Sequence, residues 1–120
     1  MIIVSLVLNI LVLVAVGGSL IAKAGWTRSA YGDRTPARDI LLAIYLAILI
    51  ASVGLLAGHL IAPAAWILGA IVALLGVQIV YKVLTAVTVQ RALRNPVVLS
   101  NLGIAAVHGV TIATVVPLLR

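Results

Sequence analysis

The sequence contains no cysteine and no glutamate, and only ten of its 120 residues are charged. Without cysteine, the chain has no disulfide framework, no thiolate metal site and no cysteine nucleophile. Soluble domains carry charge on roughly a quarter of their residues, whereas 65% of this chain is hydrophobic and its mean hydropathy is +1.37. The composition therefore predicts an integral membrane protein whose single domain, residues 1–120, has lipid as most of its solvent.

Motifs that carry known chemistry are also missing. We find no Ser-x-x-Lys or Gly-x-Ser-x-Gly, no phosphate-binding glycine loop and no His/Asp/Glu cluster with metal-ligand spacing. No carboxylate lies inside a long apolar run, so a proton-coupled transporter of the type that needs a membrane carboxylate is disfavoured. The sequence thus predicts neither an enzyme nor a metal site.

Four uncharged stretches are long enough to cross a hydrocarbon core of about 30 Å as helices. They cover residues 2–22, 40–61, 64–81 and 97–119, and the third extends to 90 if Lys82 is immersed. They are continuous Leu, Ile, Val and Ala runs rather than alternating strands, which excludes a barrel. Asn95 and Pro96 fit the N-cap and first position of the last helix. We expect an all-α bundle of four transmembrane helices with short loops, and we expect the first helix to be retained rather than cleaved as a signal peptide.

Nine of the ten charges lie in two connections, residues 23–39 and 82–96. With four spans, these connections share one side of the membrane, and their Lys/Arg excess assigns that side to the cytoplasm. Both termini are then non-cytoplasmic. We expect a multi-pass protein of a bacterial inner (cytoplasmic) membrane.

The same basic residues are candidates for contact with anionic lipid headgroups or with an acidic partner subunit. They are Lys23, Arg28, Arg34, Arg38, Arg91 and Arg94. Nucleic acid is not an expected partner, because orientation in the membrane already explains the basic charge.

Small residues recur at steps of three and four on the second and third spans and include Gly54, Gly58, Gly69 and Gly76. Helices in lipid associate through such residues because they let backbones approach closely. We expect the two stripes to pack against each other across the short Ala62-Pro63 turn. The alternative is that one of them forms an oligomer or partner-subunit interface.

Polar residues within the spans are few and fall on one side of each helix, so they should point inward rather than to lipid. A polar path would include Ser52, Gln78, Lys82, Asn101 and His108. The default interpretation is hydrogen bonding between helices. For Lys82 we favour an ordinary charge flanking a span that ends at Tyr81. The alternative is burial, with Asn101 or Asp39 as its partner.

His108 lies near the middle of the last span, where a neutral imidazole needs a hydrogen-bond partner. By depth, Gln78 and Ser52 are the expected partners. The other hypotheses are a proton relay or a ligand to haem or a pigment. A second ligand from His59 to the same haem is disfavoured, because His59 is roughly 10–15 Å away along the helix axis.

These features favour an accessory or scaffolding subunit of a larger membrane complex, in an energy-converting, pigment-binding or transport assembly. The alternative is a homo-oligomeric channel or transporter for an anion or small neutral solute, using the polar path through Lys82 and His108.

Overall fold

The computed structural model describes residues 1–119, and all regular secondary structure in that range is helical. Its elements are α1 (Ile2–Ile21), α2 (Gly25–Tyr31), α3 (Pro36–Ile61), α4 (Ala65–Thr88), η1 (Ala92–Arg94), α5 (Pro96–Val115) and η2 (Val116–Leu119), where η marks a 3-10 helix. Four segments are long and apolar enough to cross a membrane, Ile2–Ile21, Pro36–Ile61, Ala65–Thr88 and Pro96–Leu119. The chain is therefore an all-helical, multi-pass membrane protein, and its longest dimension of 45 Å is close to the thickness of a bilayer with its headgroups.

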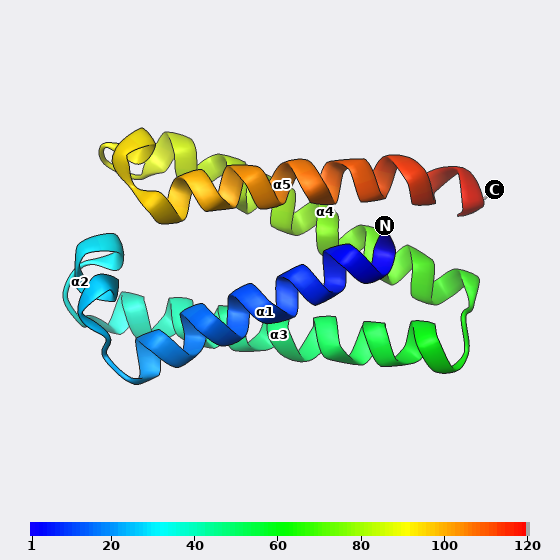
Figure 1. Ribbon diagram of the computed structural model, residues 1–120, viewed down its shortest axis with the longest axis horizontal. Helices are drawn as coiled ribbons and strands as arrows, with labels where there is room; N and C mark the ends of the chain where they lie inside the picture. The colour runs from blue at the N-terminus through cyan, green and yellow to red at the C-terminus, as the bar shows by residue number, and fades with distance from the viewer. Residues whose placement is uncertain (120) are drawn as a thin grey trace.

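The long helices form two antiparallel pairs, α1 with α3 and α4 with α5 (Figure 1). The chain ends and the turn between α3 and α4 lie toward one end of the molecule, which we call the terminal end. The short helix α2 and η1 lie at the other, the loop end (Figure 1). At the terminal end Leu6 of α1 packs with Ile67, Ile71 and Leu75 of α4. Toward the loop end α1 and α5 diverge (Figure 1).

The helix boundaries follow capping signals. Asn95 accepts a hydrogen bond from the Val97 amide through its Oδ1 atom at 2.9 Å, with Pro96 in the first turn, as predicted. Thr35 does the same for α3, since its hydroxyl accepts from the Arg38 amide at 3.2 Å. Hence α3 begins at Pro36, earlier than the expected residue 40.

The helix α2 was not expected, because a short loop was predicted between the first two spans. It follows a left-handed turn at the end of α1, where Lys23 has φ 54°. The Ala24 amide donates to Ser19 and the Lys23 amide to Leu20, the hydrogen-bond pattern of a Schellman cap. Gly32 at φ 82° ends α2. The Asn95 side-chain amide donates to the Ala30 carbonyl at 2.9 Å, which ties α2 to the start of α5.

The glycine stripes do not pack against each other as expected. After the turn at residues 62–64, α4 runs toward α5 and away from α3 (Figure 1). Only Gly58 lies close to a neighbouring helix, since a Cβ there would come within 3.3 Å of Ile67. A Cβ at Gly54, Gly69 or Gly76 would meet nothing within 4 Å. These three glycines therefore make no close helix contact within the described chain.

Candidate functional site

Many polar side chains of the spans point into the bundle, as their spacing predicted, whereas Ser100 and Thr114 of α5 are exposed. Eight of them are buried, with exposed fractions between 0 and 7%: Ser5, Asn9, Ser52, Gln78, Lys82, Asn101, His108 and Thr111. They come from all four long helices. The chain therefore has a polar interior inside an apolar exterior, the arrangement that lipid solvent favours.

Three of these residues form a hydrogen-bonded group between α1 and α5. The Ser5 hydroxyl lies 2.7 Å from the Thr111 hydroxyl and 3.1 Å from Nδ1 of His108. The Thr111 hydroxyl also donates to the Val107 carbonyl. The expectation that Gln78 or Ser52 would be the partner of His108 is therefore wrong. The helices α1 and α5 meet near the terminal end, and this brings Ser5 next to the imidazole.

The second imidazole nitrogen, Nε2 of His108, is buried without a hydrogen-bond partner. The side chain is fully buried, and it lines none of the three cavities described below. His59 lines a cavity of about 330 Å³ at the terminal end together with Met1 and Thr114.

Ser52 is joined to α1 rather than to His108. The Asn9 amide donates to the Ser52 hydroxyl at 2.9 Å, and that hydroxyl donates to the Ile48 carbonyl at 2.8 Å. Interhelical bonds of this kind stabilise helix pairs in membranes by about 0.6 kcal/mol on average. Ser52 is therefore accounted for by packing of α1 on α3.

Lys82 is buried, in contrast to the flanking position that we favoured. The helix α4 continues past Tyr81 to Thr88, and Lys82 is only 3% exposed. Its ammonium donates to Asn101 Oδ1 at 3.2 Å and to the Tyr81 hydroxyl at 2.9 Å, and it lies 4.8 Å from the centre of the Tyr81 ring. The partner is the neutral alternative, Asn101. Asp39 pairs with Arg34 instead.

Gln78 lies one turn before Lys82 on the same face of α4 and is completely buried. Neither its amide nitrogen nor its carbonyl oxygen has a hydrogen-bond partner. Such a group costs free energy when it is buried, because its hydration is lost and not replaced. Within residues 1–119, three residues have buried side-chain polar atoms without a hydrogen-bond partner: Gln78, His108 at Nε2 and His59 at Nδ1.

A cavity of about 370 Å³ opens where α1 and α5 diverge. Four aromatic side chains line it, Trp26, Tyr31, Tyr45 and Tyr81, together with Lys82 and Asn101. The ring centroids of Trp26 and Tyr31 and those of Tyr31 and Tyr45 are each 6.3 Å apart, within the range of favourable aromatic pairs. Burial, followed by the effect of Tyr45, raises the pKa of the Tyr31 phenol, so this hydroxyl stays neutral.

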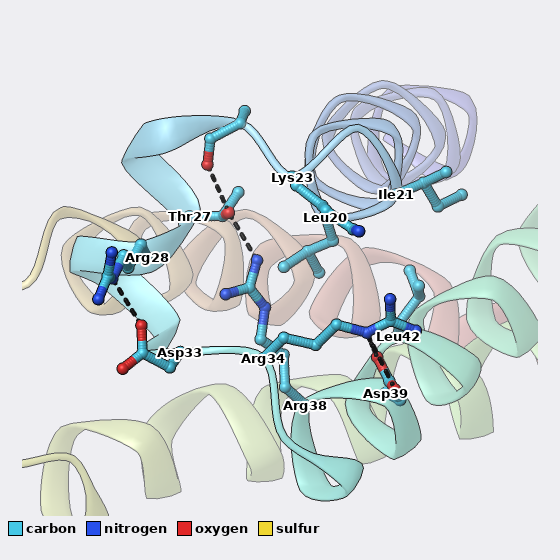
Figure 2. Close-up of a pocket in the computed structure, with 11 residues that line it drawn as sticks. Leu20, Ile21, Lys23, Thr27, Arg28, Asp33, Arg34, Arg38, Asp39 and Leu42 are labelled. Atoms are coloured by element: carbon cyan, nitrogen blue, oxygen red, sulfur yellow. Dashed lines mark hydrogen bonds and ion pairs between the residues drawn. The ribbon is translucent and has the colours of Figure 1, made fainter.

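A second cavity, of about 450 Å³, lies at the loop end beneath α2 (Figure 2). Lys23, Arg28, Arg34 and Arg38 line it with two aspartates, and exposed ion pairs join Arg28 to Asp33 and Arg34 to Asp39. Arg38 donates to the Gly32 carbonyl and to the buried Thr27 hydroxyl, so it holds the connection in place. Arg91 and Arg94 are exposed near η1, outside this cavity.

Four further residues take part in these contacts. Ser5 and Asn9 of α1 form hydrogen bonds to side chains of α5 and α3, and Trp26 and Tyr31 of α2 line the cavity between α1 and α5. No group of three or more metal-binding side chains occurs within residues 1–119. No protein-family model, curated protein or solved structure matches the chain.

Proposed function

We propose that this chain is an accessory or scaffolding subunit of a larger membrane complex, of the energy-converting, pigment-binding or transport kind, in a bacterial inner membrane. The observation that carries the proposal is the exposure of α3. Only 11% of the residues in its most apolar stretch are buried, against 28% in each of the other three spans. A helix with so few buried residues packs on α1 along one face and leaves the rest of its surface available for a neighbour.

The exposed face of α3 has the composition of a helix-packing surface. Exposed residues recur at alternating steps of four and three, at Ala43, Ala47, Ile50, Gly54, Ala57 and Ile61. Four of the six are small, and this spacing is the one that lines a seam between two helices. We call these six residues the α3 seam. Lipid tails can cover a helix face of large residues as well as one of small residues. The small residues of the α3 seam therefore favour a protein neighbour, because they allow another helix to approach closely.

Gly54→Leu should therefore release the partner without unfolding the chain. A Cβ at Gly54 has no atom of this chain within 4 Å, and a leucine there would block a close helix approach from outside. Gly18→Leu on α1 is the matched control, since that glycine is equally open. The measurement is native isolation in mild detergent followed by identification of copurifying proteins. We expect a defined partner with the unmodified chain and with Gly18→Leu, and its loss with Gly54→Leu. A chain that isolates alone, as a stable monomer, would contradict the proposal.

For orientation we propose that the loop end faces the cytoplasm and both termini face away from it. The six basic residues of the sequence prediction all lie in the connections at the loop end, where they can meet anionic headgroups at about 1 kcal/mol for each charge near the surface. We expect a reporter that is active only in the cytoplasm to stay silent when fused to either terminus. The same reporter inserted in the exposed turn around Gly32 should be active, and the reverse result would overturn the orientation.

A second candidate function is a channel or transporter for an anion or small neutral solute. It is favoured by the row of buried polar groups along α5, from Asn101 with Lys82 to His108 and Thr111. A cavity lies near each end of that row, one with Lys82 and one with Thr114. Gln78 of α4 and His108 of α5 lie between the two cavities along their helices. The unpartnered Gln78 amide and the Nε2 atom of His108 would supply polar contacts for a solute.

A further inference from the structure

The cavity between α1 and α5 contains a buried cation that has no counterion among residues 1–119. The Lys82 side chain is only 3% exposed, and both of its hydrogen-bond acceptors are neutral groups. The two aspartates of the chain are paired with Arg28 and Arg34 at the exposed loop end. An ammonium has three donors, so one N–H of Lys82 has no acceptor among the described residues. A buried charge of this kind needs an anion to offset its lost hydration.

The rest of the cavity suits an apolar body. Beyond the four aromatic rings, its lining includes Val12, Leu13, Val16, Val97 and Ile104. The exposed residues Ala15 of α1 and Ser100 of α5 also line it, which places its mouth between these two helices. In a membrane-spanning chain, a mouth between two spans is open to molecules dissolved in the bilayer. The volume of about 370 Å³ lies within the range of small-molecule sites.

From this combination we infer that the cavity binds a single-chain amphiphile with one carboxylate head, such as a long-chain fatty acid. The carboxylate accepts hydrogen bonds from Lys82 Nζ and from the Asn101 side-chain amide. The hydrocarbon tail of the ligand passes the aromatic rings and leaves the cavity between α1 and α5. A phosphate head is the poorer match, because no arginine lines this cavity and doubly charged, multidentate anions are best held by guanidinium groups. The inference is independent of the proposed role as a subunit.

The two tryptophans make the inference measurable. Trp26 lines the cavity, whereas Trp66 is 73% exposed near the start of α4 at the terminal end. The probe is dibromostearate, whose bromines quench tryptophan on contact, added to the whole chain in nanodiscs of zwitterionic lipid. In the Trp66→Phe variant, the tryptophan fluorescence comes from Trp26 alone. Trp26→Phe reports only the dibromostearate dissolved in the surrounding bilayer.

We expect saturable quenching in Trp66→Phe and gradual, non-saturable quenching in Trp26→Phe. Adding Lys82→Met to the Trp66→Phe chain should raise the half-saturating concentration about tenfold, the effect of losing one charge-assisted hydrogen bond. Lys23→Met, an exposed lysine outside the cavity, should leave it unchanged. The methyl ester of the probe should quench like a bulk lipid component. Equal saturation by acid and ester, or no shift with Lys82→Met, would overturn the inference.

A second pair of variants keeps Lys82 and narrows the mouth instead. Ser100→Phe places a ring at the opening, and Ala106→Phe places the same ring on an exposed part of α5 outside the cavity. Saturable quenching should be lost with Ser100→Phe and kept with Ala106→Phe. If both variants bind the probe as the parent does, the cavity is not its site and the inference fails.

Discussion

Ser5→Ala should destabilise this protein by about 1–3 kcal/mol, the usual cost of leaving a buried polar group unpaired. The Ser5 hydroxyl is the hydrogen-bond partner of both Thr111 and His108. Thr111 keeps its bond to Val107, but His108 would then have no partner at either nitrogen. The effect therefore comes mainly from the imidazole, which cannot reach water from its fully buried position.

The measurement is the free energy of reversible unfolding in detergent, monitored by circular dichroism. Ser29→Ala is the matched control, because Ser29 is exposed and bonds only to the carbonyl of Trp26 in its own helix. The double variant Ser5→Ala with His108→Leu should recover part of the loss, since both unpaired groups are then removed together. If Ser5→Ala unfolds like Ser29→Ala, the group around His108 does not hold α1 to α5.

Gln78→Leu should have the opposite effect on stability and should strongly reduce any solute transport. Both polar atoms of the Gln78 side chain are buried without a partner, so a leucine of similar size removes a cost of about 1–3 kcal/mol. A buried amide that lowers stability is expected where function requires it. As part of a polar path, its loss should reduce solute flux in proteoliposomes by about tenfold or more, equivalent to 1.4 kcal/mol on a barrier.

Val77→Leu is the control, since Val77 is the neighbouring residue and is 67% exposed. It should change neither the free energy of unfolding nor the flux. A flux in Gln78→Leu equal to that of the unmodified chain would contradict the transport function. A less stable Gln78→Leu variant would show that the amide is satisfied in the native protein, and the unpaired-amide argument would then be wrong.

Local signals in the sequence predicted most of the fold. Long uncharged runs gave the four spans, and Asn95-Pro96 marked the start of the last helix, because both depend on neighbouring residues alone. The same reasoning applied to Thr35-Pro36 would have placed the start of α3 correctly. The short helix α2 carries no side-chain cap at its N-terminus, so no comparable signal marked it.

Contacts between helices were harder to predict, because spacing defines the face of a helix and not the neighbour of that face. The periodicity of Asn101 and His108 showed correctly that they point inward. It could not show that Ser5 is the partner of His108, since this depends on α1 crossing to α5. Similarly, the Gly54 to Gly58 motif is divided in the structure, with Gly58 against Ile67 and Gly54 facing outward. The burial of Lys82 was not predicted, because residues 64–81 are already long enough to cross the membrane. Nothing in the sequence required the helix to continue to Thr88.

The proposed role as a subunit is tested most directly by photo-crosslinking from the α3 seam in native membranes. A benzophenone side chain at Ala47 lies on the seam, and one at Val110, which is 53% exposed on α5, is the matched position on another span. The account predicts an adduct with one defined, different polypeptide from Ala47 and none from Val110. No protein adduct from Ala47, or adducts only with a second copy of this chain, would contradict it.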